Sequence, residues 1–318
     1  MRRVLALLGH SLALALLALA LNFFLLRLAP ASPFAALERD DLGTVFTAEQ
    51  RARLEAHYGL DRPLWAQFLA YFGRLFQGRL GESFYFNQPV TQVIVPYLAN
   101  TAILVGLGFF PALLVGLLLA LLSVAFHRTP LEGGLFTTMI LLKSLPPYFT
   151  AMALLLLLAV LWPLFPTTAT SLPGMGFGEN LRRLFLPALA YALWEVGTIY
   201  LVARGALFSV LGSPFVAYAR AKGVPESWVY LRHVLRAALP PLLARITLLL
   251  AGSLGGVFFV ERVFAYPGLS TLALAAVGRF DYPLLEGVFL VSLGAVLFLN
   301  LLADLLLAFL DPRTREAA

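Results

Sequence analysis

The chain of 318 residues has no cysteine, only four histidines, and only 13% charged residues. Without cysteine there is no disulfide framework, no thiolate nucleophile and no cysteine-ligated metal. The histidines, at positions 10, 57, 127 and 233, are not spaced as a pair of metal ligands. The sequence therefore predicts no metal site.

Motifs of catalysis are missing as well. The two lysines, Lys143 and Lys222, lack the glycines of the phosphate-binding pattern G-x-x-x-x-G-K-[ST]. Neither H-E-x-x-H nor G-x-S-x-G occurs in the chain. We therefore expect no enzyme activity and no cofactor in this chain itself.

Apolar residues are abundant. The chain is 60% hydrophobic, its mean hydropathy is +0.86, and several apolar runs exceed the roughly 20 residues that span a bilayer. These features predict an all-α integral membrane protein with about six transmembrane helices. The expected spans are residues 4–28, 98–126, 134–161, 184–210, 242–264 and 284–310.

Residues 29–97 differ from the rest because they hold many charged residues and turn signals. We expect a helical external insertion there, between a first transmembrane helix at residues 1–28 and a five-helix core at residues 98–318. Within the insertion, Leu64 to Phe76 is an amphipathic stretch rich in aromatic residues. Such a helix suits the membrane–water interface or a partner surface, and packing on the protein's own helices is the open alternative.

The formal charge of +6 fits the positive-inside rule better than nucleic-acid binding. With the N-terminus inside, the termini and short inside loops carry nine basic residues, and the short outside loops carry three, at 182, 183 and 279. The inside residues are Arg2, Arg3, Arg128, Arg220, Lys222, Arg232, Arg236, Arg313 and Arg315. This bias predicts that both termini are cytosolic.

Two features of the expected spans are candidates for a translocation pathway. Lys143 and Ser144 precede Pro146 and Pro147, which interrupt the third span, and unwound backbone at membrane depth is tolerated only against protein or water. Glu195 lies in the fourth span, where an ionisable side chain normally faces the bundle interior or water. A packing kink and a structural pairing of Glu195, with Lys143 as a candidate partner, are the open alternatives.

The longest non-membrane interval of the C-terminal two-thirds runs from Ser213 to Pro241. Ser213 can accept hydrogen bonds from free backbone N–H groups, Pro214 suits the first helical position, and Gly223 suits a left-handed helix end. We therefore expect a short helix from Pro214 to Lys222.

A second helix is expected to begin at Pro225 and Glu226 and to end at Pro240 and Pro241, whose rings clash with a continuing helix. The first helix is too short to be stable alone in water, so it must dock on another surface. Its docking face is predicted from the spacing i, i+3, i+4 and i+7. That face holds Phe215, Tyr218, Ala219 and Lys222.

This elbow, residues 211–241, resembles the EAA loop of ABC-importer permeases of the dipeptide/oligopeptide/nickel family. The residues that carry the resemblance are Ala219-Arg220-Ala221-Lys222-Gly223, then Arg232-His233, Leu235-Arg236 and Pro241. Further matches in the same order are Leu26 to Pro30, Gly59 to Pro63, Gly78 to Ser83, Leu186 to Ala190, Glu261, Phe264, Tyr266 to Leu269, Asp281 to Pro283, Asn300 to Leu302, Asp304, and Leu310 to Arg313. Ala217-Tyr218 depart from the family, which usually has Glu or Arg followed by a small residue.

The resemblance implies a type I ABC-importer permease that moves peptides or similar small solutes inward across the inner membrane. It also implies a second similar permease, two cytosolic subunits that bind ATP and Mg²⁺, and an external substrate-binding protein. The residues it assigns to coupling with the ATPase are Phe215, Tyr218, Ala219, Arg220, Lys222 and Gly223.

Two other classes stay open on the residues alone. A self-sufficient proton-coupled secondary transporter could use Lys143, Glu195 and Asp304, although such carriers commonly show repeats with paired broken helices. Here only the break at Pro146-Pro147 is clear. The other class is a non-catalytic assembly scaffold.

Overall fold

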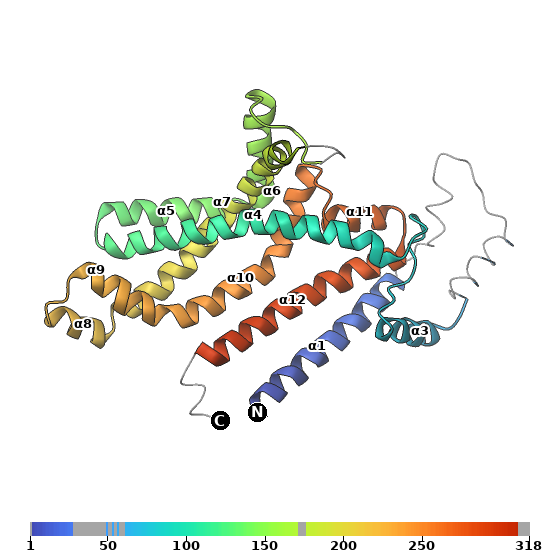
Figure 1. The fold of residues 1–318 in the computed structure, drawn as a ribbon, viewed down its shortest axis with the longest axis horizontal. Helices are drawn as coiled ribbons and strands as arrows, with labels where there is room; N and C mark the ends of the chain where they lie inside the picture. The colour runs from blue at the N-terminus through green and yellow to red at the C-terminus, as the bar shows by residue number, and fades with distance from the viewer. Residues whose placement is uncertain are drawn as a thin grey trace. The chain divides into compact units, whose positions relative to one another are not determined.

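The computed structural model describes residues 2–27, 61–170 and 176–310, together with Glu49, Arg53 and Ala56. Much of the expected external insertion, and the chain from residue 311 onward, lie outside the described residues. Over the described ranges the structure is helical, with one isolated bridge between Glu82 and Pro89. The helices are α1 (Arg2–Arg27), α3 (Leu64–Phe76), α4 (Val90–Ala125), α5 (Pro130–Ser144), α6 (Pro147–Leu155), α7 (Phe177–Leu211), α8 (Pro214–Ala221), α9 (Glu226–Trp228), α10 (Leu235–Val263), α11 (Leu269–Gly278) and α12 (Tyr282–Leu310), with π-helical segments η1 (Leu156–Leu161) and η2 (Val229–Val234) (Figure 1).

Four helical stretches of the described chain are long and apolar enough to cross a membrane, and a fifth is added if α5 and α6–η1 form one broken span. These stretches are α4, α7, residues 226–253 and residues 282–305. The 26 residues of α1 reach about 39 Å at 1.5 Å per residue, long enough for a sixth span. The side chains of α1 are described only in part, so its role as a span stays a prediction.

The chain divides into two compact units. The first unit comprises residues 1–7, 101–266 and 296–318, and the second comprises residues 8–100 and 267–295. Helices α1, α4 and α12 contribute residues to both.

In the first unit, α7 is the central helix, and α5, α6 and α10 pack against it. Its Tyr191 and Tyr200 are fully buried. Glycine allows close helix approach here, because a Cβ on Gly116 of α4 would lie 2.9 Å from Ile199, and one on Gly197 of α7 would lie 3.0 Å from the Met139 carbonyl oxygen of α5. The first unit therefore owes its tight packing to small residues facing large ones.

The interruption at Pro146-Pro147 is confirmed. Helices α5 and α6–η1 meet there at 91°. Pro147 occupies the start of α6, where its missing N–H removes no helical hydrogen bond. The Pro146 carbonyl accepts from Phe149 N at 2.9 Å, so the new helix begins at once.

Two predicted helix starts are wrong, and one helix was not predicted. Helix α4 begins at Val90 and α7 at Phe177, each about two turns earlier than expected. An ion pair between Glu179 and Arg183, 3.1 Å apart, supports the added turns of α7. Helix α11 lies within residues 265–283, which were expected to form a loop. It starts after the Pro267-Gly268 turn, and its ten residues have an apolar face to bury.

The predicted helix end at Pro240-Pro241 is also wrong, because α10 continues through both prolines. The backbone just upstream, in η2, is π-helical. The carbonyls that Pro240 and Pro241 leave without a helical donor are those of Arg236 and Ala237. Membrane helices tolerate such prolines where other groups satisfy the freed carbonyls.

In the second unit, α3 has the predicted bounds and packs on α1. Phe68 stacks on Phe24 with ring centroids 5.4 Å apart, and buried Tyr71 lies against Phe23 at 5.4 Å. Burial raises the pKa of Tyr71 to about 12. The exposed residues of the helix include Trp65 and Phe76. Part of the aromatic stretch therefore packs on one of the protein's own helices, which was the alternative to an interface or partner surface.

The second unit also holds buried polar contacts to its C-terminal segment. Arg27 forms an ion pair with Glu286 of α12. Buried Asp281 accepts hydrogen bonds from the Ser83 hydroxyl at 2.5 Å and from Tyr85 N at 3.1 Å. These contacts join residues 8–100 to residues 267–295.

Candidate functional site: a helix–glycine–helix elbow

The first helix of the elbow ends at a left-handed glycine, as predicted. Helix α8 runs from Pro214 to Ala221 with Lys222 as its C-cap. Gly223 has φ +79° and donates its N–H to the Arg220 carbonyl at 2.9 Å. No atom lies within 4 Å of a Cβ built at Gly223, so backbone conformation alone requires glycine.

The predicted capping role of the Ser213 hydroxyl is wrong. The Ser213 Oγ donates to the Val210 carbonyl at 2.6 Å and makes no cap hydrogen bond to α8. The Val210 carbonyl also accepts from Ser213 N at 2.9 Å, so both the side chain and the backbone of Ser213 bond to the C-terminal end of α7. The Ser213 carbonyl, in turn, begins α8 by accepting from Val216 N at 3.1 Å.

Helix α8 has one buried face and one exposed face. Val216 and Ala219 are buried, whereas Phe215 and Tyr218 are 46% and 62% exposed. Lys222 is exposed too, and its Nζ lies 4.6 Å from the centre of the Tyr218 ring. Three residues of the predicted docking face are thus exposed, whereas Ala219 packs inward, and docking of the exposed three on a partner stays a prediction. We call Phe215, Tyr218 and Lys222 the docking face.

An ion pair closes the elbow across Gly223. The Arg220 guanidinium donates to the Glu226 carboxylate of α9 through Nε at 2.8 Å and a terminal nitrogen at 3.2 Å. This hydrogen bond raises the pKa of Arg220 above its usual value. Because the pair is bidentate, it favours one orientation of α8 relative to α9, although its side chains are 33% and 53% exposed and water weakens it.

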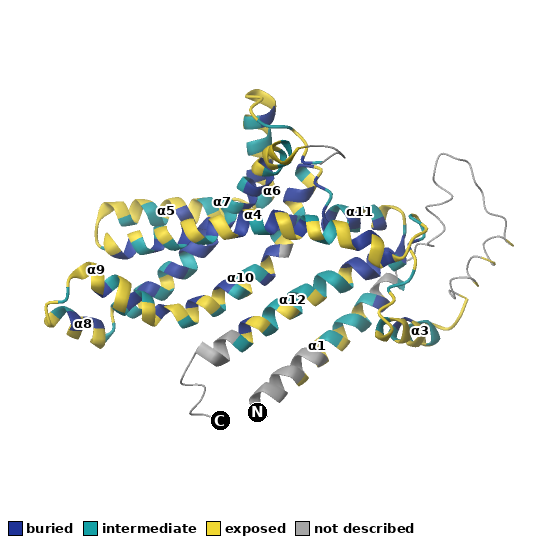
Figure 2. Cartoon of the chain, in the orientation of Figure 1, coloured by how far each residue is buried: buried dark blue, intermediate teal, exposed yellow. Residues whose placement is uncertain are grey.

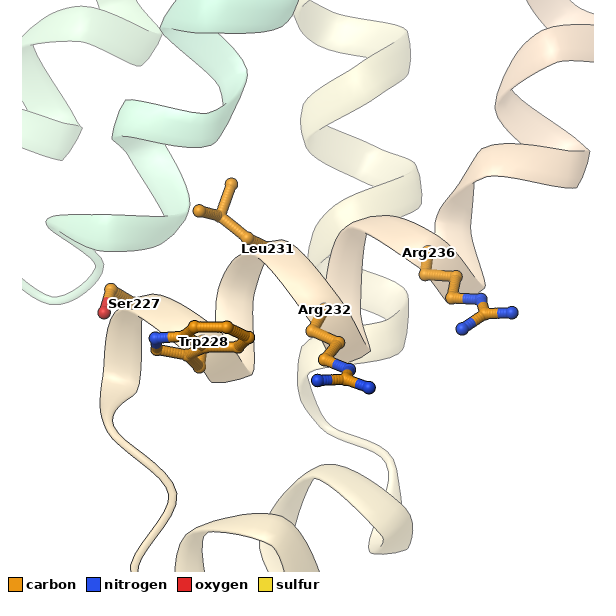
Figure 3. A pocket seen from close by; sticks show the side chains of 5 residues that line it. All are labelled: Ser227, Trp228, Leu231, Arg232 and Arg236. Carbon is orange, nitrogen blue, oxygen red and sulfur yellow. The ribbon is translucent and has the colours of Figure 1, made fainter.

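A pocket of about 410 Å³ opens beside the second arm of the elbow (Figure 3). Arg232 and Arg236, which belong to the family resemblance, extend along one side of the arm beside Trp228. The pocket is lined by Ser227, Trp228, Leu231, Arg232 and Arg236. The spacing of 228, 232 and 236 could have predicted this surface from the sequence.

The structure does not bring Lys143 and Glu195 together. Glu195 is buried, and its Oε1 accepts a hydrogen bond from the Tyr191 hydroxyl at 2.9 Å. Lys143 and Ser144 are exposed at the end of α5, where the Ser144 Oγ donates to the Ile140 carbonyl at 2.8 Å. Glu195 thus pairs with Tyr191 on its own helix and not with Lys143.

The remaining pathway candidates lie at the bend between α5 and α6. Pro146 is exposed and Pro147 is partly exposed. A role in the pathway for Lys143, Ser144, Pro146, Pro147 and Glu195 stays a prediction.

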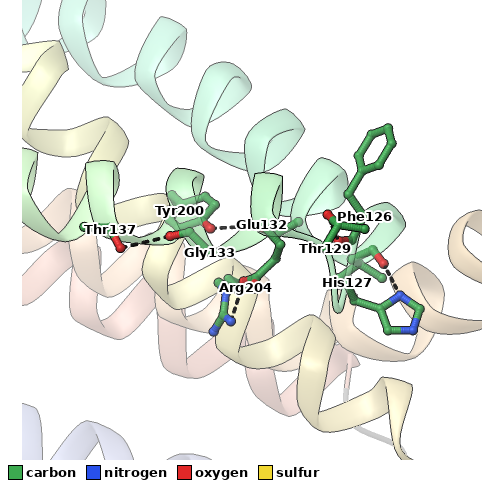
Figure 4. Close-up of polar contacts among 10 residues, drawn as sticks. Phe126, His127, Thr129, Glu132, Gly133, Thr137, Tyr200 and Arg204 are labelled. Carbon is green, nitrogen blue, oxygen red and sulfur yellow. Dashed lines mark hydrogen bonds and ion pairs between the residues drawn. The ribbon is translucent and has the colours of Figure 1, made fainter.

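An ion pair that sequence reasoning missed joins α5 to α7 (Figure 4). Arg204 donates through Nε and a terminal nitrogen to Glu132 Oε1, at 2.8 and 2.5 Å. The guanidinium also lies 4.2 Å from the ring centre of Phe136 and 4.4 Å from that of Phe208. The two charged residues are 72 positions apart, so no local pattern reveals the pair.

The chain is similar to known transport proteins. A family model described as "Binding-protein-dependent transport system inner membrane component" matches residues 112–316. A putative peptide permease protein of Brucella suis biovar 1 is 33% identical over 318 residues, covering 99% of this chain and 98% of the relative. The dipeptide transport system permease protein DppB of Lactococcus lactis subsp. cremoris is 30% identical, with 93% of each chain covered. The oligopeptide transport system permease protein AppB of Bacillus subtilis is 28% identical, with 92% of each covered.

Proposed function

The chain belongs to the family of binding-protein-dependent transport system inner membrane components and is a permease subunit of an ABC importer, and we propose that it moves peptides or similar small solutes inward. The full-length similarity to proteins named as peptide, dipeptide and oligopeptide permeases carries this proposal. Membership of this family favours the importer over the self-sufficient carrier.

A permease of this family is a multi-pass inner-membrane protein without catalytic activity, and it works with an ATPase and a substrate-binding protein. We propose further that two ATP-binding subunits and a second, homologous permease complete the importer. ATP and Mg²⁺ then bind to the partner subunits. In this arrangement both termini of the chain are cytosolic, as the distribution of basic residues favours.

We propose that α8 is the element that contacts the ATPase. Its docking face of Phe215, Tyr218 and Lys222 is exposed, whereas its opposite face is buried in the first unit. An eight-residue helix is too short to be stable alone, so its own packing and its partner must hold it.

The connection from α8 to the spans is short. The ion pair between Arg220 and Glu226 links α8 to α9, and α9 continues through η2 into α10 without a break. A displacement of α8 by the ATPase would therefore move the cytosolic end of α10. This linkage supports transmission of nucleotide-driven motion to the membrane segment.

The test is reconstitution. We expect the chain, co-expressed with its neighbouring transporter genes, to co-purify with ATP-binding subunits and a second permease. Vesicles holding this complex should take up labelled peptide only with ATP and the binding protein. An ATPase variant that binds but does not hydrolyse ATP is the control and should give no uptake. Uptake by the chain alone, driven by a proton gradient, would contradict the proposal.

A further inference from the structure

Helix α10 has two distinct faces (Figure 2). One face, with Leu242, Ile246, Val257 and Val260, is buried in the core of the first unit. The other face is exposed and recurs at spacings of three and four residues. We call it the α10 stripe; it contains Arg245, Leu248, Gly252, Gly255, Phe259 and Arg262.

The exposed face of α4 gives a contrast within the same unit. It consists of large apolar side chains, which are Ile103, Leu107, Phe110, Leu114, Leu118 and Leu122. That is the composition of a surface in contact with lipid tails. The α10 stripe instead carries two guanidinium groups and two glycines, a composition that does not suit lipid tails.

Arg245 is the charged residue of α10 that lies farthest from both ends of the helix. Residues 237–244 and 246–260 hold no charged side chain, and Arg245 lies nine positions beyond Arg236, about 14 Å along the helix axis. Its side chain is exposed and makes no hydrogen bond, ion pair or ring contact with the described part of the chain. An arginine cannot lose its proton at neutral pH, so this charge must meet water or an anion.

We propose that the α10 stripe lines the aqueous route of the transported solute and that Arg245 binds a carboxylate of that solute as it passes. This inference rests on the proposed function, because a peptide carries a C-terminal carboxylate. The planar guanidinium matches a carboxylate with two parallel hydrogen bonds. Gly252 and Gly255, with no atom within 4 Å of an added Cβ, leave room beside the stripe.

The first experiment tests the aqueous lining. Because the chain has no cysteine, Arg245→Cys, Leu248→Cys and Gly252→Cys can be introduced singly into the complete importer in vesicles. We expect all three to react with a small water-soluble thiol reagent, whereas Leu114→Cys and Leu118→Cys on α4 should not. If the three α10 positions fail to react from either side of the membrane, or if the α4 controls react equally, the lining is overturned.

The second experiment tests the carboxylate. Uptake of a peptide is compared with uptake of its C-terminal amide, in wild type and in Arg245→Gln, with the same binding protein. The acid-to-amide uptake ratio of Arg245→Gln is divided by that of the wild type. Any preference of the binding protein is the same in both and therefore cancels. We expect the acid-to-amide ratio to fall about tenfold in Arg245→Gln, the effect of losing one charge-assisted hydrogen bond. The ratio should fall less in Arg245→Lys, which keeps the charge but cannot make the two parallel hydrogen bonds, and it should be kept in Arg236→Gln.

An unchanged ratio in Arg245→Gln would overturn the carboxylate contact and assign Arg245 to the cytosolic interface of the bilayer. The two proposals also fail in different ways. If the cysteine variants react along the stripe but the wild-type importer takes up no peptide, peptides are refuted as substrates and, with them, the peptide carboxylate, while the aqueous lining is supported.

Discussion

Gly223 is the residue on which the elbow depends, because its φ of +79° disfavours any side chain although the space around it is open. We predict that Gly223→Val strains this turn by about 1 to 3 kcal/mol. The spans keep their own packing, so the variant should insert at normal levels. Peptide uptake and binding-protein-stimulated ATP hydrolysis in reconstituted vesicles should be lost.

Two matched variants show whether the left-handed backbone is the cause. Gly212→Val adds the same side chain eleven positions earlier, where φ is −81° and no atom lies within 4 Å of an added Cβ, and coupling should survive. Gly223→Asn should fall between the two, because asparagine tolerates the left-handed region better than valine. Normal coupling in Gly223→Val would exclude the elbow as the transmitting element.

Tyr218 provides most of the exposed aromatic area of the docking face, and Lys222 lies over its ring. Removing the ring leaves the backbone of α8 unchanged. We therefore predict that Tyr218→Ala weakens, without abolishing, co-purification of the ATPase and stimulated hydrolysis. Trp65→Ala removes a ring of similar exposure from α3 in the second unit and should leave co-purification unchanged. Equal losses in both variants would contradict a specific contact at Tyr218.

Between elements, the ion pair of Arg204 with Glu132 is the contact whose loss should matter most for the packing of α5 on α7. Both side chains are mostly buried, at 22% and 16% exposure. We predict that Glu132→Gln destabilises the protein by about 1 to 3 kcal/mol, because a partly buried guanidinium loses its charged partner. Thermal unfolding of the purified complex in detergent measures the change.

A second ion pair of the chain is the control. Arg53 and Glu49 lie 2.6 Å apart but are 78% and 76% exposed. Exposed pairs contribute little because water and salt screen them, so Glu49→Gln should leave the unfolding temperature unchanged. If Glu132→Gln also leaves it unchanged, the buried pair does not hold α5 to α7.

Elements set by local chemistry could be predicted from the sequence. The bounds of α3 follow from its turn signals and aromatic spacing, and Gly223 follows from the backbone that a helix end needs. The break after α5 follows from its prolines. Arg245 was visible as a charge within an expected span, yet only the structure shows that its side chain is exposed and without a partner.

Features set by more distant parts of the chain could not be predicted. Helix α10 passes through Pro240 and Pro241 and follows a π-helical segment, and the local proline rule predicts neither feature. The Ser213 hydroxyl bonds to the end of α7 and not to the start of α8, a choice that the capping rule does not predict. Glu195 accepts a hydrogen bond from Tyr191, one turn earlier on α7, whereas Lys143 is exposed. Only the packed structure distinguishes these two candidate partners of Glu195.

For the whole molecule, the orientation in the membrane decides whether the elbow can reach an ATPase at all. The described loops place Arg128 between α4 and α5, Lys222 in the elbow and Arg182 near the start of α7. The positive-inside bias assigns the first two to the cytosol and Arg182 to the outside. The same assignment puts both termini inside, and it is testable without the partner subunits because the chain has no cysteine of its own.

We predict that Arg128→Cys and Lys222→Cys resist a membrane-impermeant maleimide in sealed cells and react once the membrane is permeabilised. Arg182→Cys and Glu55→Cys should react in sealed cells, whereas Arg315→Cys should resist. The cause is the cost of moving arginine and lysine across the bilayer during insertion, which retains basic loops on the cytosolic side. Reaction of Lys222→Cys from outside would place α8 where no ATPase can bind, and the coupling role of the elbow would have to be abandoned.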